Sequence, residues 1–497
     1  MSVTTLLLFA ILVIWVLAWT GAPLWLWTLA IVSCGYALLQ ATGASAGWWF
    51  AAVSGLGFMI FVNFTAARTR LLTSAMFQLF KRIVPTLSAD QRANLNFGDL
   101  WWEGELFRGR PDWNKLLTFQ RTRLTDAERE LLADAVPAVC EAAAESDDAG
   151  WGRAKQLGFM GLGVSRQYSG LGLSFAAQTR VISKVATAAP AFAHDLGRLQ
   201  RVPEWIAEHG SIAQKQHWLP LVVTGEIIIS SAIPAKLGWQ SEGCSAKAVV
   251  RPAGDNGGLS LRLDFPTHHV RMAARCSMIA LPVDVSDPDG LLASGKRQGT
   301  AVVLLPRETV GIEFSPSQNT ASGANVVVGI DTLIGGEEMI GSSSPLRFEE
   351  AVRNRGVSST SLTSAIGKRG YLVTSAYVRI ASGDGRELAE TEAAQASMAA
   401  VAVTAYRLEA YRSLIGSAND VSTPVLMSSV IKLLSTADAQ ENLAAAAGLL
   451  PRGMPLLGEH NKQLNALLRA DDSLSRLAYG DLFSQLVFRA HPYVLSS

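Results

Sequence analysis

Three uninterrupted apolar runs open the chain. They comprise Leu6–Trp19, Leu24–Leu39 and Trp48–Phe64, and short segments rich in Gly, Pro, Ser and Thr separate them. No Asp, Glu, Lys or Arg occurs before Arg68. A helix needs about 20 apolar residues to cross a bilayer, and each run is somewhat shorter than that. The pattern therefore predicts an anchor of two or three transmembrane helices over residues 1–67.

The flanks of these runs favour a membrane anchor over its alternatives. A cleaved signal peptide is disfavoured because no basic residue precedes the first run and two more runs follow it. A buried hairpin of a soluble domain is the other interpretation of the pattern. Arg68, Arg70, Lys81 and Arg82 follow the last run, so the positive-inside rule predicts that the rest of the chain is cytoplasmic.

An amphipathic helix is expected next. Leu71, Ala75, Leu79 and Ile83 recur at helical spacing, with basic residues elsewhere on the helix. Such a helix lies on a membrane surface or packs against the domain that follows it. We assign residues 68–123 to this helix and to a Trp-rich connector.

The longer remainder changes from helical to β-rich and back to helical. Apolar spacing predicts a helical domain over 124–226, which opens with Thr125 and Glu128 in capping-box spacing. Short β-rich runs with Gly, Pro and Asp turns fill 227–340, and Ala- and Leu-rich helical composition returns over 341–497. Helices, then strands, then helices again predict an α+β fold in three layers.

Composition and charge exclude several function classes. The chain has 497 residues, with 43 Lys and Arg against 42 Asp and Glu, so no basic excess indicates nucleic acid. The apolar runs carry no ionisable side chain for transport, which makes them a tether. The four cysteines have no metal-ligand spacing, and His268 and His269 fall on opposite faces of a strand. We therefore expect no metal site.

The most distinctive motif of the cytoplasmic part precedes the helical domain. It reads Trp101-Trp102-Glu103-Gly104-Glu105-Leu106-Phe107. Further motifs follow in order along the chain: Tyr168-x-Gly170-Leu171, His209-Gly210, Ser286-Asp287-Pro288, Ile334-Gly335-Gly336, Arg355-Gly356 and His491-Pro492-Tyr493-Val494. Taken together, these motifs resemble the bacterial membrane-anchored long-chain acyl-CoA dehydrogenases over nearly the whole chain.

The resemblance implies a fold, a reaction and partners. The fold is an N-terminal helical domain, a middle β domain and a C-terminal helical bundle, with FAD held between the domains. The reaction is FAD-dependent α,β-dehydrogenation of long-chain acyl-CoA to trans-2-enoyl-CoA in fatty acid β-oxidation, with electrons passed to an electron-transfer flavoprotein. The resemblance also implies a homo-oligomer anchored in the lipid bilayer of the bacterial inner membrane.

Two segments match the parts of that family that hold the flavin. The first covers residues 230–241, where Ala232 stands in place of a family hydroxyl. The second reads His269-Val270-Arg271, where the family has an aromatic residue, Ile and Thr. An Arg beside a flavin stabilises a reduced anion, whereas an ordinary surface strand is the alternative. The resemblance thus implies these cofactor-binding residues: Ser231, Ala232, Pro234, Gly238, Val270 and Arg271.

The catalytic residues implied by the resemblance lie near the C-terminal helices. The family's catalytic Glu stands about twenty residues before its terminal His-Pro-Tyr-Val, and counting back without gaps gives Asp471. Aspartate keeps the carboxylate but shortens its reach by a methylene, and a solvated acid at a helix end is the alternative. Arg355 matches a family Arg close to the active site.

A second hypothesis comes from the pattern of differences. The substitutions concentrate at cofactor and base positions, whereas scaffold motifs such as Trp101-Trp102-Glu103-Gly104 persist. The alternative function is therefore that of a catalytically degenerate paralogue. Such a protein keeps the fold and the anchor, and binds acyl chains or partner subunits without oxidising them.

Overall fold

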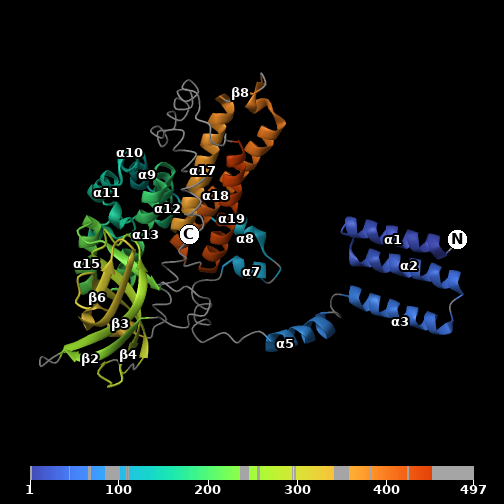
Figure 1. The fold of residues 1–497 in the computed structure, drawn as a ribbon, viewed down its shortest axis with the longest axis horizontal. Coiled ribbons are helices and arrows are strands. Elements are labelled where there is room, and N and C mark those ends of the chain that lie inside the picture. Colours follow the sequence, from blue (N-terminus) through green and yellow to red (C-terminus); the bar gives the residue numbers. More distant parts are fainter. Residues whose placement is uncertain are drawn as a thin grey trace. The chain divides into compact units, whose positions relative to one another are not determined.

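The chain divides into two compact units, Met1–Ser88 and Ala89–Ser497. The computed structural model describes residues 3–43, 45–64, 69–83, 101–107, 109, 111–234, 246–253, 258–293, 295, 298–340, 357–380, 382–383, 386–422 and 425–449. Figure 1 shows the ribbon with the helices and strands labelled.

The first unit contains three apolar helices that coincide with the three apolar runs. They are α1 (Val3–Trp19), α2 (Leu24–Thr42) and α3 (Ala46–Asn63). Gly43 ends α2 in the left-handed conformation, with φ 61°. The Asn63 amide donates a hydrogen bond of 2.7 Å to the Thr28 hydroxyl, which joins α3 to α2. Helix formation satisfies the backbone of these runs internally, as a bilayer requires.

By length and composition, one of the described helices is able to cross a membrane. The segment is Trp25–Thr42 within α2, and α1 holds the shorter apolar segment Phe9–Trp19. The number of spans therefore stays a prediction. A π-turn, η1 (Thr69–Thr73), and helix α5 (Ser74–Ile83) follow. Every side chain of α5 is exposed, including its apolar ones.

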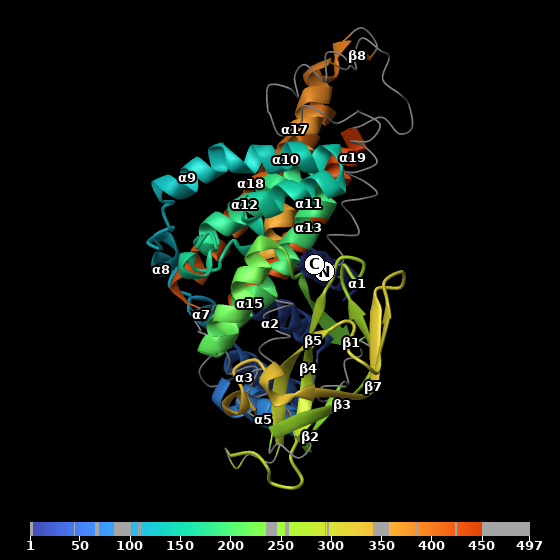
Figure 2. The ribbon, with the colours of Figure 1, turned by 90° about the vertical axis from the view of Figure 1, so that its left-hand side faces the viewer.

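The first layer of the second unit is helical (Figures 1 and 2). It comprises α7 (Glu103–Phe107), α8 (Trp113–Leu117), α9 (Asp126–Ala133), α10 (Ala135–Glu145), α11 (Asp147–Gln156), α12 (Phe175–Ala188), α13 (Pro190–Leu199), α14 (Arg201–His209) and α15 (Ile212–Thr224). The capping box expected at the start of α9 is present between Thr125 and Glu128. The Glu128 carboxylate also accepts hydrogen bonds from the Ser174 N–H at 2.9 Å and hydroxyl at 2.7 Å. This single side chain therefore ties the start of α9 to the start of α12.

The core of this layer surrounds Phe159, Ile182 and Leu196, which are almost completely buried. Gln200, buried at the end of α13, accepts a hydrogen bond of 2.8 Å from the Leu162 N–H. Its amide nitrogen donates to the Phe159 carbonyl at 3.0 Å. These bonds satisfy backbone groups that would otherwise be buried without partners, and they fix the position of α13.

The second layer is a β-sheet. Its strands are β1 (Ile229–Pro234), β2 (Lys247–Ala253), β3 (Gly258–Val270), β4 (Met278–Ser286), β5 (Gln298–Pro306), β6 (Ile312–Ser315) and β7 (Thr320–Gly329). The strand order is β1-β4-β2-β3-β7-β6, with β5 on β4. Both β1 and β2 run parallel to β4 and antiparallel to β3, so they lie end to end in one gap between these two strands.

The sheet buries both of its faces. Alternate residues, such as Leu261, Leu281 and Val303, form a core of the β layer itself. Residues of the opposite parity, such as Met278 and Ala280, pack against α14 and α15 of the helical layer. This two-sided burial explains why β4 is a nearly continuous apolar run instead of an alternating one.

The third layer is a helical bundle of α17 (Val357–Ile380), α18 (Glu392–Val421) and α19 (Val425–Leu449), with a short hairpin of β8 (Ser382–Gly383) and β9 (Arg386–Glu387). It packs closely on α12. A Cβ at Gly416 would lie 2.9 Å from Thr179 Oγ1, so only glycine permits this approach. The Asp420 carboxylate accepts a hydrogen bond of 2.6 Å from the Phe175 N–H, which caps α12 from the bundle. The expected order of helices, strands and helices is confirmed.

The Trp-rich motif serves packing in this fold. The Trp101 ring contacts Phe119 at a centroid distance of 4.8 Å, and both pack beside Ile415 and Met427 of the bundle. Trp102 Nε1 donates to the Asp112 carbonyl at 2.9 Å. The motif thus attaches the connector to the bundle.

Candidate functional site

The two segments that resemble flavin-binding segments meet in the structure. The end of β1 pairs antiparallel with the end of β3, so that Ala232 lies opposite Val270 and Pro234 opposite His268. The segments are separated by more than thirty residues of sequence, yet their ends lie side by side within the sheet, and we call this pair of strand ends the strand edge. The structure therefore brings together five of the predicted cofactor residues, which are Ser231, Ala232, Pro234, Val270 and Arg271.

Strand parity divides these residues into two groups. Ala232 is 1% exposed and Val270 is completely buried, and both belong to the core of the β layer. Any contact from these two positions to a bound group is therefore made by backbone atoms. Ser231 has the opposite parity and is half-buried, as is Arg271 after the strand end. Both residues offer polar side chains where the two strands pair.

The turn after β3 is held firmly. The Ser230 hydroxyl donates a hydrogen bond of 2.8 Å to the Arg271 carbonyl. Met272 adopts the left-handed conformation with φ 52°, and its carbonyl accepts from the Arg275 N–H at 2.9 Å. The turn therefore places Arg271 close enough for its charge to interact with His194, Asp195 and Arg198 of α13.

Helix α13 carries a cluster of ionisable side chains that faces Arg271. The Arg198 Nε donates a hydrogen bond of 3.0 Å to His194 Nε2, and His194 Nδ1 lies 3.3 Å from the Asp195 carboxylate. His194 is 3% exposed, so its buried imidazole links the Asp195 carboxylate to the Arg198 guanidinium. Arg201, at the start of α14, is also buried. Through its electrostatic interaction with Arg271, the cluster connects the helical layer with the paired ends of β1 and β3.

Electrostatics in this cluster favour an anion. Burial, together with the charges of Arg271 and Arg201, lowers the pKa of Arg198 to about 10, and Asp195 only partly opposes this. Burial also lowers the pKa of Arg271, against the attraction of Asp195. The pKa of His194 falls for the same reason, despite its hydrogen bond to Asp195. Burial is the main cause of the lowered guanidinium values, and a nearby anion would favour the charged form of these groups.

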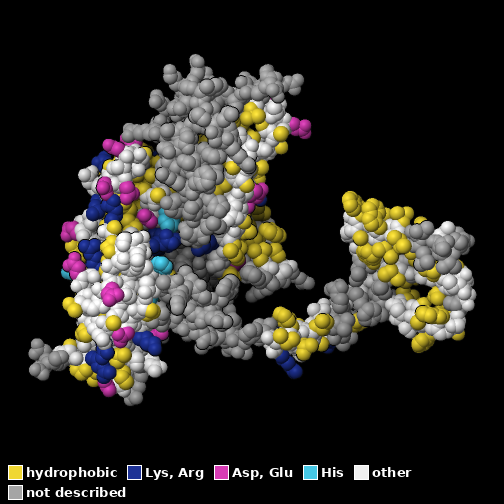
Figure 3. All heavy atoms as spheres, in the orientation of Figure 1, with side chains coloured by type: hydrophobic (Ala, Val, Ile, Leu, Met, Phe, Trp, Pro, Cys, Tyr) yellow, Lys and Arg dark blue, Asp and Glu magenta, His cyan; other side chains and the backbone are white. Residues whose placement is uncertain are grey.

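The space-filling view is consistent with this description. Figure 3 shows Lys, Arg and His side chains side by side near α13 and the adjoining end of the sheet. The sequence analysis did not single out the residues of α13. The signal for them in the sequence is the i, i+4 spacing of His194 and Arg198, with Asp195 between them, in a mainly apolar helix.

Three predicted site residues, Gly238, Arg355 and Asp471, lie outside the described residues. Among the described residues, no group of three His, Cys, Asp or Glu side chains is placed to hold a metal ion. His268 is buried and His269 is exposed, as alternate positions of a strand require.

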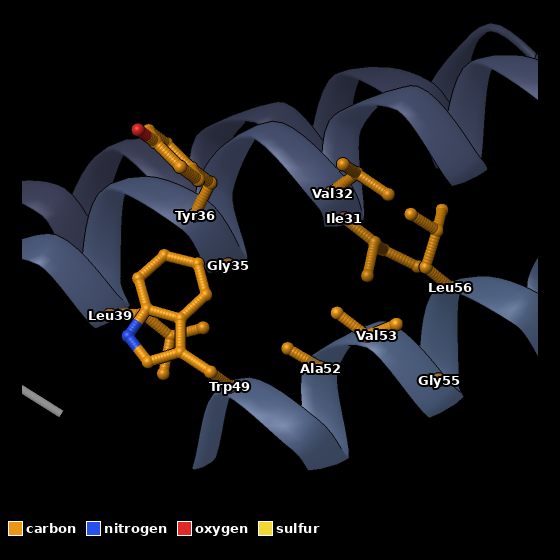
Figure 4. Close-up of a pocket in the computed structure, with 10 residues that line it drawn as sticks. All are labelled: Ile31, Val32, Gly35, Tyr36, Leu39, Trp49, Ala52, Val53, Gly55 and Leu56. Atoms are coloured by element: carbon orange, nitrogen blue, oxygen red, sulfur yellow. The ribbon is translucent and has the colours of Figure 1, made fainter. Parts of the chain in front are cut away.

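A separate apolar cavity lies between α2 and α3 in the first unit (Figure 4). Its volume is about 350 Å³, and its walls include Ile31, Val32 and Val53. Tyr36 closes one end against Trp49, with ring centroids 5.7 Å apart. The described residues that line this cavity include no carboxylate, imidazole, ammonium or guanidinium group, so they offer shape to an apolar group.

Comparison with known proteins agrees with the order of the layers. Residues 120–226 match the family model described as acyl-CoA dehydrogenase, N-terminal domain. This chain has the acyl-CoA dehydrogenase fold. Solved structures of that fold match at low sequence identity but with nearly complete coverage of their own chains.

Three of these structures illustrate the match. Acyl-CoA dehydrogenase from Geobacillus kaustophilus is 18% identical, with a TM-score of 0.54 over 76% of this chain and 100% of that one. Glutaryl-CoA dehydrogenase from Mycobacterium smegmatis in complex with FADH2 is 17% identical, with a TM-score of 0.54 over 78% and 99%. Butyryl-CoA dehydrogenase from Megasphaera elsdenii is 16% identical, with a TM-score of 0.54 over 74% and 100%.

The described residues fit an anionic flavin cofactor in charge and in backbone arrangement. The paired strand ends present backbone groups, Ser231 supplies a hydroxyl, and the cluster around Arg271 supplies positive charge. The hydroxyl lies one position before the site where the sequence analysis expected it.

Proposed function

We propose that the chain is an FAD-dependent acyl-CoA dehydrogenase of fatty acid β-oxidation that converts long-chain acyl-CoA to trans-2-enoyl-CoA. The observation that carries the proposal is the meeting of β1 and β3 beside the cationic cluster of α13. A fold match alone would not suffice, because one fold supports many functions. The paired strand ends and the buried ionisable side chains beside them are features of a site.

In this proposal, the backbone at Ala232 and Val270 and the hydroxyl of Ser231 hold the flavin ring, and Arg271 faces it. FAD, when bound, supplies a hydride acceptor. Arg271 and Arg198 stabilise negative charge that develops next to them, since fixed charges in a buried site require no reorganisation. His194 keeps Arg198 oriented toward the strand edge through its hydrogen bond of 3.0 Å.

We propose that the carboxylate of Asp471 removes the α-proton of the thioester and that Arg355 lies close to this base. Both assignments rest on the sequence motifs around these residues. A base that has lost a methylene must approach its proton more closely, and a misplacement near 1 Å lowers the rate on the order of a hundredfold. Turnover slower than that of enzymes with Glu is therefore part of the proposal.

The visible spectrum tests flavin binding. We expect the full chain, purified in mild detergent, to carry a flavin absorbance band near one cofactor per chain. Addition of long-chain acyl-CoA should bleach this band, and Asp471→Asn should abolish bleaching while the band itself persists. A colourless, folded protein that FAD cannot reconstitute would refute the proposal. Bleaching that survives Asp471→Asn would move the base to another residue.

We also propose that α1 to α3 anchor the chain in the bacterial inner membrane, with the second unit in the cytoplasm and electrons passing to an electron-transfer flavoprotein. Support comes from the absence of charge before Arg68 and from the helical form of all three runs. Alkaline carbonate extraction of bacterial membranes tests the anchor. We expect the full chain to stay in the pellet, and quantitative release into the supernatant would contradict anchoring.

Exposed apolar side chains on the bundle support a homo-oligomer. Tyr406 of α18 and Leu433 of α19 are 75% and 74% exposed, and Val403 is also exposed. Exposed apolar surface of this kind is typical of interfaces between subunits.

The degenerate paralogue is retained as a second candidate because of one observation. Ala232 and Arg271 stand where the family pattern has hydroxyl side chains, so neither position supplies the expected hydroxyl. If this candidate is correct, the purified protein is colourless and still binds acyl chains. The same spectrum therefore separates the two functions.

A further inference from the structure

A second cavity in the cytoplasmic unit lies away from the paired strand edge, between helices α12, α17 and α18. Its volume is about 610 Å³. Each helix contributes a stripe of side chains at i, i+4 and i+7 spacing, for example Ser364, Lys368 and Tyr371 from α17. This spacing places the three side chains of a stripe on one helix face. The cavity is therefore built by helix packing and does not depend on a loop.

The lining is strongly basic. Arg180 and Lys184 come from α12, Lys368 from α17 and Arg412 from α18, whereas Glu409 is the acid among the described lining residues. Hydroxyl groups, including that of Thr187, fill much of the remaining wall. A cavity of this size takes a small organic molecule, and the cations among its lining residues favour an anionic one.

The single acid is already satisfied. Arg412 Nε donates to the Glu409 carboxylate at 2.8 Å, and Ser364 Oγ donates to it at 2.7 Å. Arg412 is 2% exposed, and its Nη1 also donates to Thr179 Oγ1 at 2.8 Å. Glu409 and Arg412 thus form a pair in the wall of the cavity, and the charge of Glu409 also attracts Arg180.

The other cations have spare capacity. Lys184 Nζ donates one hydrogen bond, of 2.9 Å, to the Leu132 carbonyl, which leaves two of its three donors. Within the described part of the chain, Arg180 and Lys368 make no hydrogen bond or ion pair. Burial and the nearby charge of Arg412 lower the pKa of Arg180. Four cations therefore line one cavity in which Glu409 is the one acid among the described lining residues, so positive charge exceeds negative charge there.

We propose that this cavity binds a phosphate-bearing anion through Arg180, Lys184 and Lys368. Arginine pairs with two phosphate oxygens at once, and lysine ammonium groups act as point charges on the same group. The hydroxyl groups of the cavity wall form hydrogen bonds with the polar remainder of the ligand. The phosphate belongs either to a soluble metabolite such as a nucleoside diphosphate or to the headgroup of an anionic phospholipid, and the chemistry of recognition is shared.

Calorimetric titration of the full chain in a zwitterionic detergent tests the site. The probes are pyrophosphate and ADP as soluble phosphates, and short-chain phosphatidylglycerol against phosphatidylcholine as lipids. We expect at least one phosphate-bearing probe to bind, with affinity that falls as salt is raised. Binding of ADP or pyrophosphate identifies a soluble ligand, and binding of phosphatidylglycerol alone identifies a lipid headgroup.

Variants assign the binding to this cavity. We expect Lys368→Glu to weaken binding about tenfold or more, the effect of roughly one lost charged contact. If this variant folds poorly, the milder Arg180→Gln replaces it, with the same expected result. Lys247→Glu is the matched control, because Lys247 is exposed on β2 and its substitution changes the net charge by the same amount as Lys368→Glu. Arg271→Ala separates this cavity from the proposed flavin site. No binding by any probe, or equal weakening in Lys368→Glu and Lys247→Glu, would overturn the proposal.

Discussion

Replacing Glu409 with alanine is expected to lower the free energy of unfolding by about 3 kcal/mol, at the lower end of the range for breaking a buried ion pair. Arg412 is 2% exposed and would keep its charge without its carboxylate partner. The value lies at the lower end because the Glu409 side chain is itself half exposed. The hydrogen bond from Arg412 to Thr179 remains and compensates only in part.

The same pair predicts a dependence on pH. Burial alone would raise the pKa of Glu409, but hydrogen bonds from Arg412 and Ser364 and the charges of Arg412 and Arg180 hold it below its ordinary value. The folded-state pKa is therefore lower than the unfolded one, about 4.3. The stabilisation is fully present above that pH and is lost as the pH falls through the folded-state value. The difference between wild type and Glu409→Ala should shrink in the same acidic range.

Denaturant unfolding of the detergent-solubilised chain, followed by Trp fluorescence, measures both effects. Glu441→Ala is the matched control, because Glu441 also pairs with an Arg of α18, at 2.9 Å from Arg407, but at the surface. A surface pair contributes about 0–1 kcal/mol. Equal losses in the two variants, or a loss in Glu409→Ala that does not change between neutral and acidic pH, would contradict the role given to the buried pair.

Local chemistry explains why much of the fold was predictable. The capping box of Thr125 and Glu128 lies within four residues, so neighbouring groups determine it without tertiary contacts. The apolar runs became helices because nothing in them interrupts the helical pattern, and Gly43 ends α2 where the left-handed conformation is needed. The nearly continuous apolar pattern of β4 likewise reflects burial on both of its faces.

The site was predictable only in part. Similarity of sequence segments identified the edge formed by β1 and β3, but their pairing is a long-range contact that the segments do not encode locally. The cluster around His194 and Arg198 was missed because charge on a helix is ordinarily solvated, and its burial is a consequence of tertiary packing. The basic cavity was missed for a related reason. Its cations lie on separate helices, far apart in sequence, and each looks like an ordinary surface residue alone.

These two basic regions differ in what surrounds them, which separates their predicted roles. At the strand edge, the charge of Arg271 is partly balanced by Asp195, and Arg271 lies beside backbone groups of two paired strands. In the bundle cavity, hydroxyl-bearing helix faces surround the cations, and the acid is paired internally. The first environment suits a planar group held from one side. The second suits a compact anion surrounded by donors.

Reversal of charge at the strand edge, by Arg271→Asp, is expected to reduce flavin occupancy at least tenfold, equivalent to about 1.4 kcal/mol or more of binding free energy. The new carboxylate would stand near Asp195 and turn an excess of positive charge into repulsion of an anionic flavin. Arg271→Lys keeps the charge and should retain most of the flavin. Arg275→Ala is the control in the same turn, because Arg275 pairs with Asp147 and Asp148 and not with the cluster.

Flavin content per chain after gel filtration, and titration of the flavin-free protein with FAD, measure this effect independently of turnover. A second measurement distinguishes a specific role from a structural one. In any flavin that Arg271→Ala retains, the reduction potential should become more negative, because a positive charge next to the ring stabilises the reduced anion. Thermal unfolding should be nearly unchanged, since Arg271 is only half-buried and Ser230 bonds to its backbone carbonyl instead of its side chain. Unaltered occupancy in Arg271→Asp would show that the flavin, if bound, lies elsewhere.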